Sequence, residues 1–325
     1  MTSQPGFQVI MTSPHLADPA VTVLEQAGCT IHYMPPYPSA RAVAMLTGDV
    51  QAHAILTRQG PVTAAAMDAS ARLRIIARHG VGVDDVDLDA ARARGIIVAR
   101  APASNSRAVA EHTIAMILAL AKDFRALGEL ITAGNWRGGT TMVRDIYGMR
   151  LGLLGFGAIG REVAMLAQCF GMDIMALPRP GATIELLGPV AQAPDLGTLL
   201  RRSDVLSVHC PYTLDTHHII DATALASMPK GSYLVNTARG GIIDESALVG
   251  ALDSGHIAGA ALDVFETEPP PKDFGLRRHP KVLATPHVSG VTERSLVNMG
   301  LMAAECIVAC LTGQAVPAER VVVGQ

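Results

Sequence analysis

Aromatic residues are scarce in this chain, supplying only 4% of its 325 positions, with a single tryptophan at Trp136. Hydrophobic residues nevertheless make up 49%, so the apolar material is mainly aliphatic. Strands covered by helices on both faces need such side chains, and the composition therefore favours buried parallel sheets. At this length two domains are a better expectation than one core.

Cysteine is also sparse, and an odd number of scattered thiols excludes a regular disulfide framework. The five are Cys29, Cys169, Cys210, Cys306 and Cys310. The N-terminus has no basic segment followed by an apolar core, so it does not resemble a secretion signal. We therefore expect reduced thiols and a cytoplasmic location.

An excess of positive charge is absent, because the formal net charge is −3. This removes the electrostatic reason to expect nucleic acid or an anionic membrane as a partner. No apolar run approaches the length of a membrane span, and no internal repeat is evident. We expect neither a nucleic-acid nor a membrane partner.

What the chain does contain is a glycine-rich turn in the segment LGLLGFGAIG, residues 151–160. Its glycines are Gly155, Gly157 and Gly160, after a short apolar run and before a segment of helical periodicity. In a dinucleotide-binding turn, such glycines make the bend, admit the pyrophosphate and let helix pack on strand. The glycines alone are weak evidence, but the flanking strand and helix predict a nucleotide site.

Strand and helix patterns alternate along the chain, which predicts an α/β fold with doubly wound parallel sheets. We expect two Rossmann-like domains, the dinucleotide-binding domain 104–288 being inserted into a substrate domain made of 1–103 and 289–325. A helix starting near Asn105 is expected to present one apolar face that reaches Phe124. The predicted strands are 7–11, 52–57, 73–77, 96–99, 173–177, 205–208, 233–236, 259–264 and 282–285. The predicted helices include 17–27, 87–94, 196–201, 222–228, 245–252 and 293–311.

Charged side chains follow three successive predicted strands. Arg239 follows 233–236, Asp263 and Glu268 follow the next strand, and His287 comes directly after Pro286. Ligands bind beyond the carboxyl ends of parallel strands. Arginine can hold a carboxylate in a bidentate fork, and histidine suits proton transfer near neutral pH. Singly, each could be a surface cation, a solvated acid or a structural histidine; together they predict a site for a small anionic substrate.

Two further polar segments leave alternatives open. Residues 79–84, HGVGVD, place two glycines after a strand, which fits either an anion-binding turn or an ordinary connection. His217 and His218 lack a third ligand at metal spacing, so we predict a solvent-facing loop and no metal site.

In combination these segments resemble the D-isomer-specific 2-hydroxyacid dehydrogenases over nearly the whole chain. The motifs that carry the resemblance are RHGVGVDDVDL (78–88), NSRAVAEHT (105–113), LGLLGFGAIGREVA, HCPYTLDTHHII (209–220), LVNTARGGIIDESAL (234–248), GAALDVFETEPP (259–270) and TPHVSG (285–290).

The resemblance implies a catalytic set of Arg239, Glu268 and His287. Arg239 would bind the substrate carboxylate and 2-oxo group, and His287, paired with Glu268, would be the acid/base. Val81 and Gly82 would offer backbone N–H groups to the substrate. The helix from Asn105 resembles the one that forms the family's homodimer interface. The cofactor-binding positions implied are Gly155, Gly157, Ala158, Ile159, Gly160, Arg179, His209, Cys210, Pro211, Thr216, Thr237, Ala238 and Asp263, the last touching the nicotinamide amide.

Three positions qualify the resemblance. The acid expected about 20 residues beyond the glycine turn, to bind the ribose of NAD, is replaced by Pro178 and Arg179, which favours NADP over NAD. Asp85 stands where the family usually has asparagine. Arg58 stands where phosphoglycerate-using members carry arginine, so it predicts either a site for a second anionic group or a salt bridge at the rim.

The sequence thus predicts an NAD(P)-dependent oxidoreductase that moves hydride between nicotinamide and C2 of a small 2-hydroxyacid or 2-oxoacid. Hydroxypyruvate, glyoxylate and 3-phosphoglycerate are the substrates considered. One alternative is a nucleotide-binding regulatory protein on the same fold, as in the family's corepressor branch. Another is a formate dehydrogenase, which the compact N-terminal half and the pairing of Glu268 with His287 disfavour.

Overall fold

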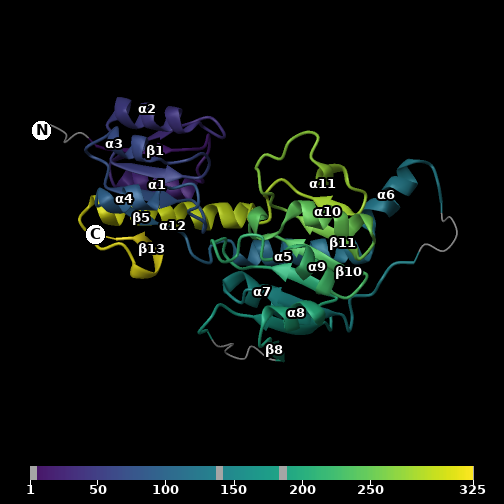
Figure 1. Ribbon diagram of the computed structural model, residues 1–325. Helices are drawn as coiled ribbons and strands as arrows, with labels where there is room; N and C mark the ends of the chain where they lie inside the picture. The colour runs from purple at the N-terminus through teal and green to yellow at the C-terminus, as the bar shows by residue number, and fades with distance from the viewer. Residues whose placement is uncertain (1–5, 137–141, 183–188, 325) are drawn as a thin grey trace, which may run out of the picture. The chain divides into compact units, whose positions relative to one another are not determined.

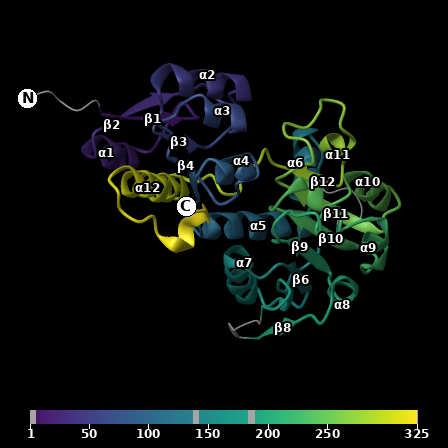
Figure 2. The same cartoon turned by 60° about the vertical axis from the view of Figure 1, so that its left-hand side comes forward.

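The computed structural model describes residues 6–136, 142–182 and 189–324. The chain divides into two compact units (Figures 1 and 2). Unit 1 comprises Met1–Asn105 and Val291–Gln325, and unit 2 comprises Ser106–Gly290. Unit 2 is thus an insertion within unit 1, and each boundary lies two residues beyond the expected one.

Unit 1 contains a six-stranded sheet in the order β13-β5-β4-β3-β1-β2. Neighbouring strands are parallel, except that β13 runs antiparallel to β5 at the edge. The C-terminal tail therefore completes the sheet that the N-terminal segment begins. The strands are β1 (Phe7–Met11), β2 (Cys29–Tyr33), β3 (Ala54–Thr57), β4 (Ile75–Arg78), β5 (Ile97–Ala99) and β13 (Val321–Val323), the last preceded by η2 (Ala318–Arg320).

Helices cover both faces of this sheet, as the alternation of side chains along β1 shows. Val9 and Met11 pack in a core with α1 (Asp18–Gln26) and α12 (Glu293–Leu311). Ile10 packs in the opposite core, which the remaining helices of the unit cover. Those helices are α2 (Ala40–Val50), α3 (Ala64–Asp68) and α4 (Leu88–Ala93).

Helix α12 is the one described helix that is long and apolar enough to cross a membrane, which the sequence prediction did not foresee. By length and composition alone this is weak evidence, because core helices of globular domains pass the same test. Its buried side chains, among them Met299, Ala303 and Ile307, pack against α1 and the sheet of unit 1. These contacts indicate a core helix.

Unit 2 contains a seven-stranded, wholly parallel sheet in the order β12-β11-β10-β9-β6-β7-β8. The order reverses direction at β6, the strand that leads into the glycine turn. A reversal of this kind is where an open parallel sheet binds its ligand. The strands are β6 (Arg150–Leu154), β7 (Asp173–Leu177), β8 (Val190–Gln192), β9 (Val205–Val208), β10 (Ser232–Asn236), β11 (Ile257–Leu262) and β12 (Val282–Ala284).

Two cores flank this sheet as well. On one face α5 (Ser106–Ala121) and α7 (Ala158–Cys169) pack on Leu151, Val205 and Val235. On the other face the remaining helices cover Leu154, Leu206 and Leu234. They are α8 (Leu196–Arg201), α9 (Ala222–Ser227), α10 (Glu245–Asp253) and α11 (Gly275–Arg278), with a short turn η1 (Gly240–Ile242) before α10.

The α/β class and the parallel sheets agree with the sequence prediction, whereas several elements were missed or misplaced. Elements β2, α2, α3, β8, α11 and β13 were not predicted. The expectation that Phe124 extends the apolar face of the long helix is wrong. Helix α5 ends at Ala121, Asp123 adopts φ 49°, and Phe124 starts the separate helix α6 (Phe124–Thr132) with 62% of its surface exposed.

Candidate active site

The charged side chains predicted at strand ends lie on neighbouring strands of unit 2. Arg239 follows β10, Asp263 directly follows β11, and His287 follows β12, and these three strands are adjacent in the sheet. Because the strands are parallel, their carboxyl ends share one edge. The structure therefore brings Arg239, Asp263, Glu268 and His287 to the same edge.

His287 and Glu268 form a direct pair, with His287 Nδ1 2.6 Å from Glu268 Oε2. Both side chains remain partly exposed, at 49% and 36%. Glu268 Oε1 also accepts a hydrogen bond from Phe265 N at 3.1 Å, so the carboxylate is held by its own loop. A carboxylate on Nδ1 selects the tautomer that leaves Nε2 for proton transfer.

The backbone around His287 is unusual and is held by the buried Asp263. His287 has φ 52°, in the left-handed region that non-glycine residues seldom adopt. Its N–H donates to the Asp263 carbonyl at 2.8 Å, and the Asp263 carboxylate accepts from Val288 N at 2.9 Å and Ser289 N at 2.8 Å. Thr285 Oγ1 donates to the same carboxylate at 2.5 Å. This network fixes the direction in which the imidazole projects.

The carboxylate of Asp263 is hydrogen-bonded within the protein, and its side chain is 0% exposed. The contact of Asp263 with the nicotinamide amide stays a prediction. Sequence reasoning missed Thr285, which joins Asp263 to His112 through a 3.2 Å contact to His112 Nε2. The one feature of the sequence that could have indicated Thr285 is its position directly after β12.

Arg239 projects from a segment whose backbone is fixed by Asn236, a second residue that sequence reasoning missed. Asn236 Oδ1 accepts from Ala238 N at 3.0 Å, and its Nδ2 donates to the Arg239 carbonyl at 2.8 Å. Gly240 follows, and a side chain there would overlap the backbone of Phe265 and Glu266. The segment with Arg239 therefore lies directly against the segment that leads to Glu268.

The glycine turn has the geometry that a dinucleotide pyrophosphate needs. Gly155 has φ 101°, and a Cβ there would lie 2.6 Å from Cys210 N, so the turn presses against the end of β9. Gly157 is the N-cap of α7, has no capping side chain, and a Cβ there would meet nothing within 4 Å. A Cβ on Gly160 would lie 2.5 Å from the Gly155 carbonyl oxygen. The first-turn N–H groups of α7, including those of Ala158 and Ile159, thus face open space suited to an anion.

The loop after β9 carries the next predicted cofactor residues. Burial lowers the pKa of His209 to about 3, so its imidazole is neutral at physiological pH. Its Nε2 lies 2.8 Å from Ser207 Oγ, while its buried Nδ1 has no hydrogen-bond partner among the residues that the structure describes. Burial raises the pKa of the Cys210 thiol to about 11. Thr216 Oγ1 donates to the Pro211 carbonyl at 2.8 Å and so shapes the loop.

Thr237 and Arg179 border the same edge. Thr237 is buried, and its hydroxyl lies 3.1 Å from that of Thr113 on α5. Arg179 is exposed and follows β7, whose last residue, Leu177, accepts a hydrogen bond from Gly155 N at 2.9 Å. An exposed arginine therefore follows the strand at whose end an NAD-binding site would place an acid.

The remaining predicted substrate residues belong to unit 1. Arg58 follows β3 and is half-buried. Within the described residues its guanidinium forms no ion pair, and both the second-anion site and the rim salt bridge stay predictions. Burial, aided by the neighbouring Arg78, lowers the pKa of Arg58. The N–H groups of Val81 and Gly82 likewise donate to no described acceptor. Asp85 forms a 2.6 Å ion pair with Arg78.

No group of three or more His, Cys, Asp or Glu side chains in the described ranges is placed to hold a metal ion. The residues of unit 2 instead form two adjoining features: a glycine turn with open N–H groups, and a histidine–carboxylate pair beside an arginine. The first fits a dinucleotide phosphate, and the second fits proton transfer on a small anion.

Comparison with known proteins agrees with a dinucleotide site and a catalytic site in unit 2. Residues 114–289, more than half of the chain, match the family model described as "D-isomer specific 2-hydroxyacid dehydrogenase, NAD binding domain". The chain is 42% identical over 227 residues to an (S)-sulfolactate dehydrogenase of Chromohalobacter salexigens, covering 69% of this chain and 72% of that protein. It is 40% identical over 234 residues to a D-3-phosphoglycerate dehydrogenase of Bacillus subtilis, covering 72% of this chain but 44% of that one.

The chain thus spans about half the length of several phosphoglycerate dehydrogenases that it matches. Among solved structures, the TT0316 protein of Thermus thermophilus superposes with a TM-score of 0.86 at 33% identity, over 98% of this chain and all of that one. A glyoxylate reductase of Paecilomyes thermophila has a TM-score of 0.83 at 30% identity, covering 98% of each chain. Sequence, fold and the arrangement at the sheet edge agree, and the chain belongs to the D-isomer-specific 2-hydroxyacid dehydrogenase family.

Proposed function

We propose that this protein is a nicotinamide-dependent D-2-hydroxyacid dehydrogenase that works as a reductase of small 2-oxoacids. The observation that carries the proposal is the 2.6 Å hydrogen bond between His287 and Glu268, at the edge that also holds Arg239 and the glycine turn. A regulatory protein on the same fold can carry the same residues, so turnover of a 2-oxoacid, tested below, is what separates the two functions.

A bound nicotinamide dinucleotide supplies the hydride donor or acceptor. Arg239 binds the substrate carboxylate and polarises the 2-oxo group, since a guanidinium provides paired donors in a fixed plane. In reduction, Nε2 of His287 donates the proton that the carbonyl oxygen needs, and in oxidation it takes that proton back. Glu268, hydrogen-bonded to Nδ1, keeps the ring oriented for that transfer.

The substrate class that we favour carries a second anionic group. Arg58 supports this, because its half-buried guanidinium has no acidic partner within the described residues. Val81 and Gly82 have backbone N–H groups that donate to no acceptor among the described residues and would serve the same anionic substrate. Two relatives are a sulfolactate dehydrogenase and a phosphoglycerate dehydrogenase. Sulfolactate and phosphoglycerate both bear an anionic group besides the carboxylate. Hydroxypyruvate and glyoxylate remain the smaller candidates.

NADP is the favoured cofactor. Pro178 and Arg179 replace the acid that would bind the ribose 2′-hydroxyl of NAD, and Arg179 is exposed at the end of β7. An arginine at this place accommodates the 2′-phosphate of NADP, whereas a carboxylate would repel it.

We further propose a homodimer in the cytoplasm, with no nucleic-acid or membrane partner. Helix α5, the interface helix expected from the sequence, packs its buried face against α7 within unit 2 and exposes Arg107 and Glu111. The adjoining α6 buries none of its residues and exposes Phe124 and Ile131, so α6 is the better candidate for subunit contact. All five cysteines are free, as a reducing compartment requires.

The test is kcat/KM for NADPH and NADH with hydroxypyruvate and glyoxylate, on the wild type and on Arg179→Ala. We expect turnover with a preference for NADPH that is lost in the variant. Turnover with an NADH preference that the substitution leaves unchanged would overturn the cofactor assignment alone. Nucleotide binding without turnover of any 2-oxoacid would favour the regulatory alternative.

A further inference from the structure

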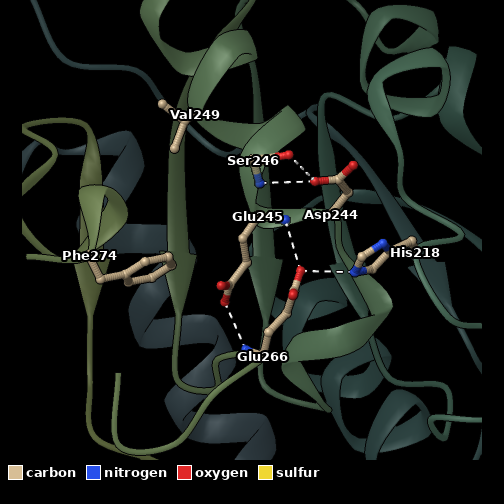
Figure 3. A pocket seen from close by; sticks show the side chains of 7 residues that line it. All are labelled: His218, Asp244, Glu245, Ser246, Val249, Glu266 and Phe274. Carbon is tan, nitrogen blue, oxygen red and sulfur yellow. Dashed lines mark hydrogen bonds and ion pairs between the residues drawn. The ribbon is translucent and has the colours of Figure 1, made fainter. Parts of the chain in front are cut away.

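Three loops of unit 2 meet beside a cavity of about 500 Å³ at the carboxyl edge of the sheet. They are residues 209–220 after β9, 237–245 after β10 and 263–268 after β11. The first carries the predicted dinucleotide contacts, the second carries Arg239, and the third leads to Glu268. Figure 3 shows the side chains that join them.

Two glutamates link the second loop to the third by reciprocal hydrogen bonds. Glu266 Oε1 accepts from Glu245 N at 3.2 Å, and Glu245 Oε1 accepts from Glu266 N at 2.9 Å (Figure 3). Each carboxylate thus satisfies the backbone of the other residue. The bonds fix the separation of two backbones, which contacts between side chains alone would not do.

His218 adds the first loop to this linkage. The ring atom Nε2 of His218 lies 2.9 Å from Glu266 Oε1, and the backbone N–H of His218 donates to the Gly241 carbonyl at 2.9 Å. It adopts φ 50°, in the left-handed region. The loop faces solvent as predicted, since residues 211–215 and His217 are exposed, but His218 is 33% exposed and pairs with Glu266, which the sequence prediction did not foresee.

The linkage lies close to the catalytic set in sequence and in space. Glu266 precedes Glu268 by two residues, and the Glu268 carboxylate bonds to Phe265 N. Gly240, next to Arg239, packs against the backbone of Phe265 and Glu266. On the other side Asp244 caps α10 through Ser246 N and Ala247 N, each at 3.0 Å, so Glu245 stands on a fixed helix start.

The charges of His218, Glu245 and Glu266 suit hydrogen bonding to backbone N–H groups rather than the binding of an ion. Burial, together with the carboxylates of Glu266 and Glu268, raises the pKa of Glu245. No metal-binding cluster occurs here among the described residues. The polar atoms of Glu245 and Glu266 instead face backbone N–H groups and His218 (Figure 3).

We propose that His218, Glu245 and Glu266 are positioning residues, which hold the Arg239 segment and the Glu268 segment at the separation that reduction of a 2-oxoacid requires and tie both to the dinucleotide loop. The inference rests on the proposed function, because it assigns the linkage to the same reaction. None of the three residues is proposed to touch the substrate.

The central variant is Glu266→Ala. It removes the two bonds that the Glu266 carboxylate accepts, from Glu245 N and from His218 Nε2, and leaves the bond from Glu266 N to Glu245 Oε1. Its side chain borders an open cavity, so truncation leaves no dry void in the core. Glu266→Gln keeps a carbonyl acceptor for Glu245 N. His218→Asn keeps a residue type that tolerates φ 50° but is too short to reach Glu266. The matched control is Asp253→Ala, which breaks a second carboxylate–histidine contact, 3.3 Å to His279, at the opposite end of α10.

We expect Glu266→Ala to lower kcat for 2-oxoacid reduction by about tenfold or more, since small displacements of reacting groups have such effects. The KM for the dinucleotide should stay within about twofold, and Glu266→Gln should restore most of the rate. Hydrogen exchange followed by mass spectrometry should show faster exchange in 237–248 and 263–268 for Glu266→Ala, a smaller change for His218→Asn, and none for Asp253→Ala.

The outcomes separate the two proposals. If the wild type reduces 2-oxoacids and Glu266→Ala matches Asp253→Ala in both rate and exchange, the positioning role is overturned and the proposed function stands. If exchange rises but kcat is unchanged, the linkage is structural only and the inference is again overturned. If the wild type has no turnover, the proposed function fails and the positioning role fails with it.

Discussion

Gly240→Ala should disable the enzyme by steric overlap alone. Gly240 does not need the left-handed backbone conformation, so alanine can adopt its φ and ψ without strain. The added Cβ would, however, overlap the carbonyl group of Phe265 and the nitrogen of Glu266, at separations that real Cβ atoms essentially never show. Both contacts are backbone atoms, which cannot rotate away as a side chain could.

The size of the effect follows from the displacement. A methyl carbon normally lies about 3.5–4.0 Å from a nonbonded carbon. The segments that carry Arg239 and Glu268 must therefore separate by more than ~1 Å. Misplacement of reacting groups by about 1 Å lowers the rate roughly 100-fold, which corresponds to ~2.7 kcal/mol of transition-state stabilisation. Overpacking of this kind lowers the free energy of unfolding by a further ~1–3 kcal/mol.

Steady-state kinetics of 2-oxoacid reduction and thermal unfolding, measured on the same preparations, test both numbers. The control is Gly250→Ala in the middle of α10, where a Cβ would meet nothing within 4 Å. At this position the substitution of glycine by alanine should raise the free energy of unfolding by ~0.5–1 kcal/mol and leave kcat/KM unchanged. A Gly240→Ala protein with kcat/KM within twofold of wild type would refute the claim that the two segments must abut for catalysis.

Three further predictions concern single side chains. His287→Gln should lower kcat by about 10²–10⁴-fold while dinucleotide affinity, measured by fluorescence titration, stays near wild type; unchanged turnover would remove the acid/base assignment. Arg58→Ala should raise the KM for 3-phosphohydroxypyruvate or sulfopyruvate by about tenfold or more and leave that for glyoxylate unchanged; equal effects on all three would argue against a second anionic group. Burial lowers the pKa of His79 to about 4, so below pH 6.5 the unfolded chain takes up a proton that the folded one does not. The free energy of unfolding should therefore fall by up to ~1.4 kcal/mol for each unit by which the pH drops from 6.5 to 4. Urea titrations at several pH values measure this dependence, which His79→Gln should weaken.

The elements predicted well are those whose pattern is local. The strands of unit 2 are continuous aliphatic runs between glycines and polar turns, and 205–208 and 196–201 match β9 and α8 to the residue. The glycine turn was predictable because each glycine meets a local steric demand, shown by the overlaps at Gly155 and Gly160.

The missed elements owe their form to tertiary contacts. Strand β13 is three residues long and exists because it pairs with β5, more than 200 positions earlier in the chain. Strand β2 has the mixed pattern CTIHY, which is typical of an edge strand and not of a buried one. Phe124 continued a helical period that Asp123 interrupts with a left-handed backbone, and period alone cannot detect such a break.

The site shows the same division. Arg239, Glu268 and His287 were predictable from their places after strands, because parallel strands deliver their ends to one edge. The buried support beneath them was not, since Asp263 acts through backbone amides of residues 288 and 289. His218 was dismissed for lacking a third metal ligand, although its partner is a carboxylate 48 positions later.

The chain path through unit 1 has a consequence for biosynthesis. Its sheet begins with β1 but needs α12 for one core and β13 for one edge, and both lie beyond the whole of unit 2. At about 5–20 residues per second, a ribosome needs roughly 10–40 s to make the intervening segment. Unit 2 is contiguous and is free to fold during that interval, while the core of Val9, Met11 and Leu56 has α1 but still lacks α12. Of the two units, the one whose synthesis starts first is therefore the last to be completed.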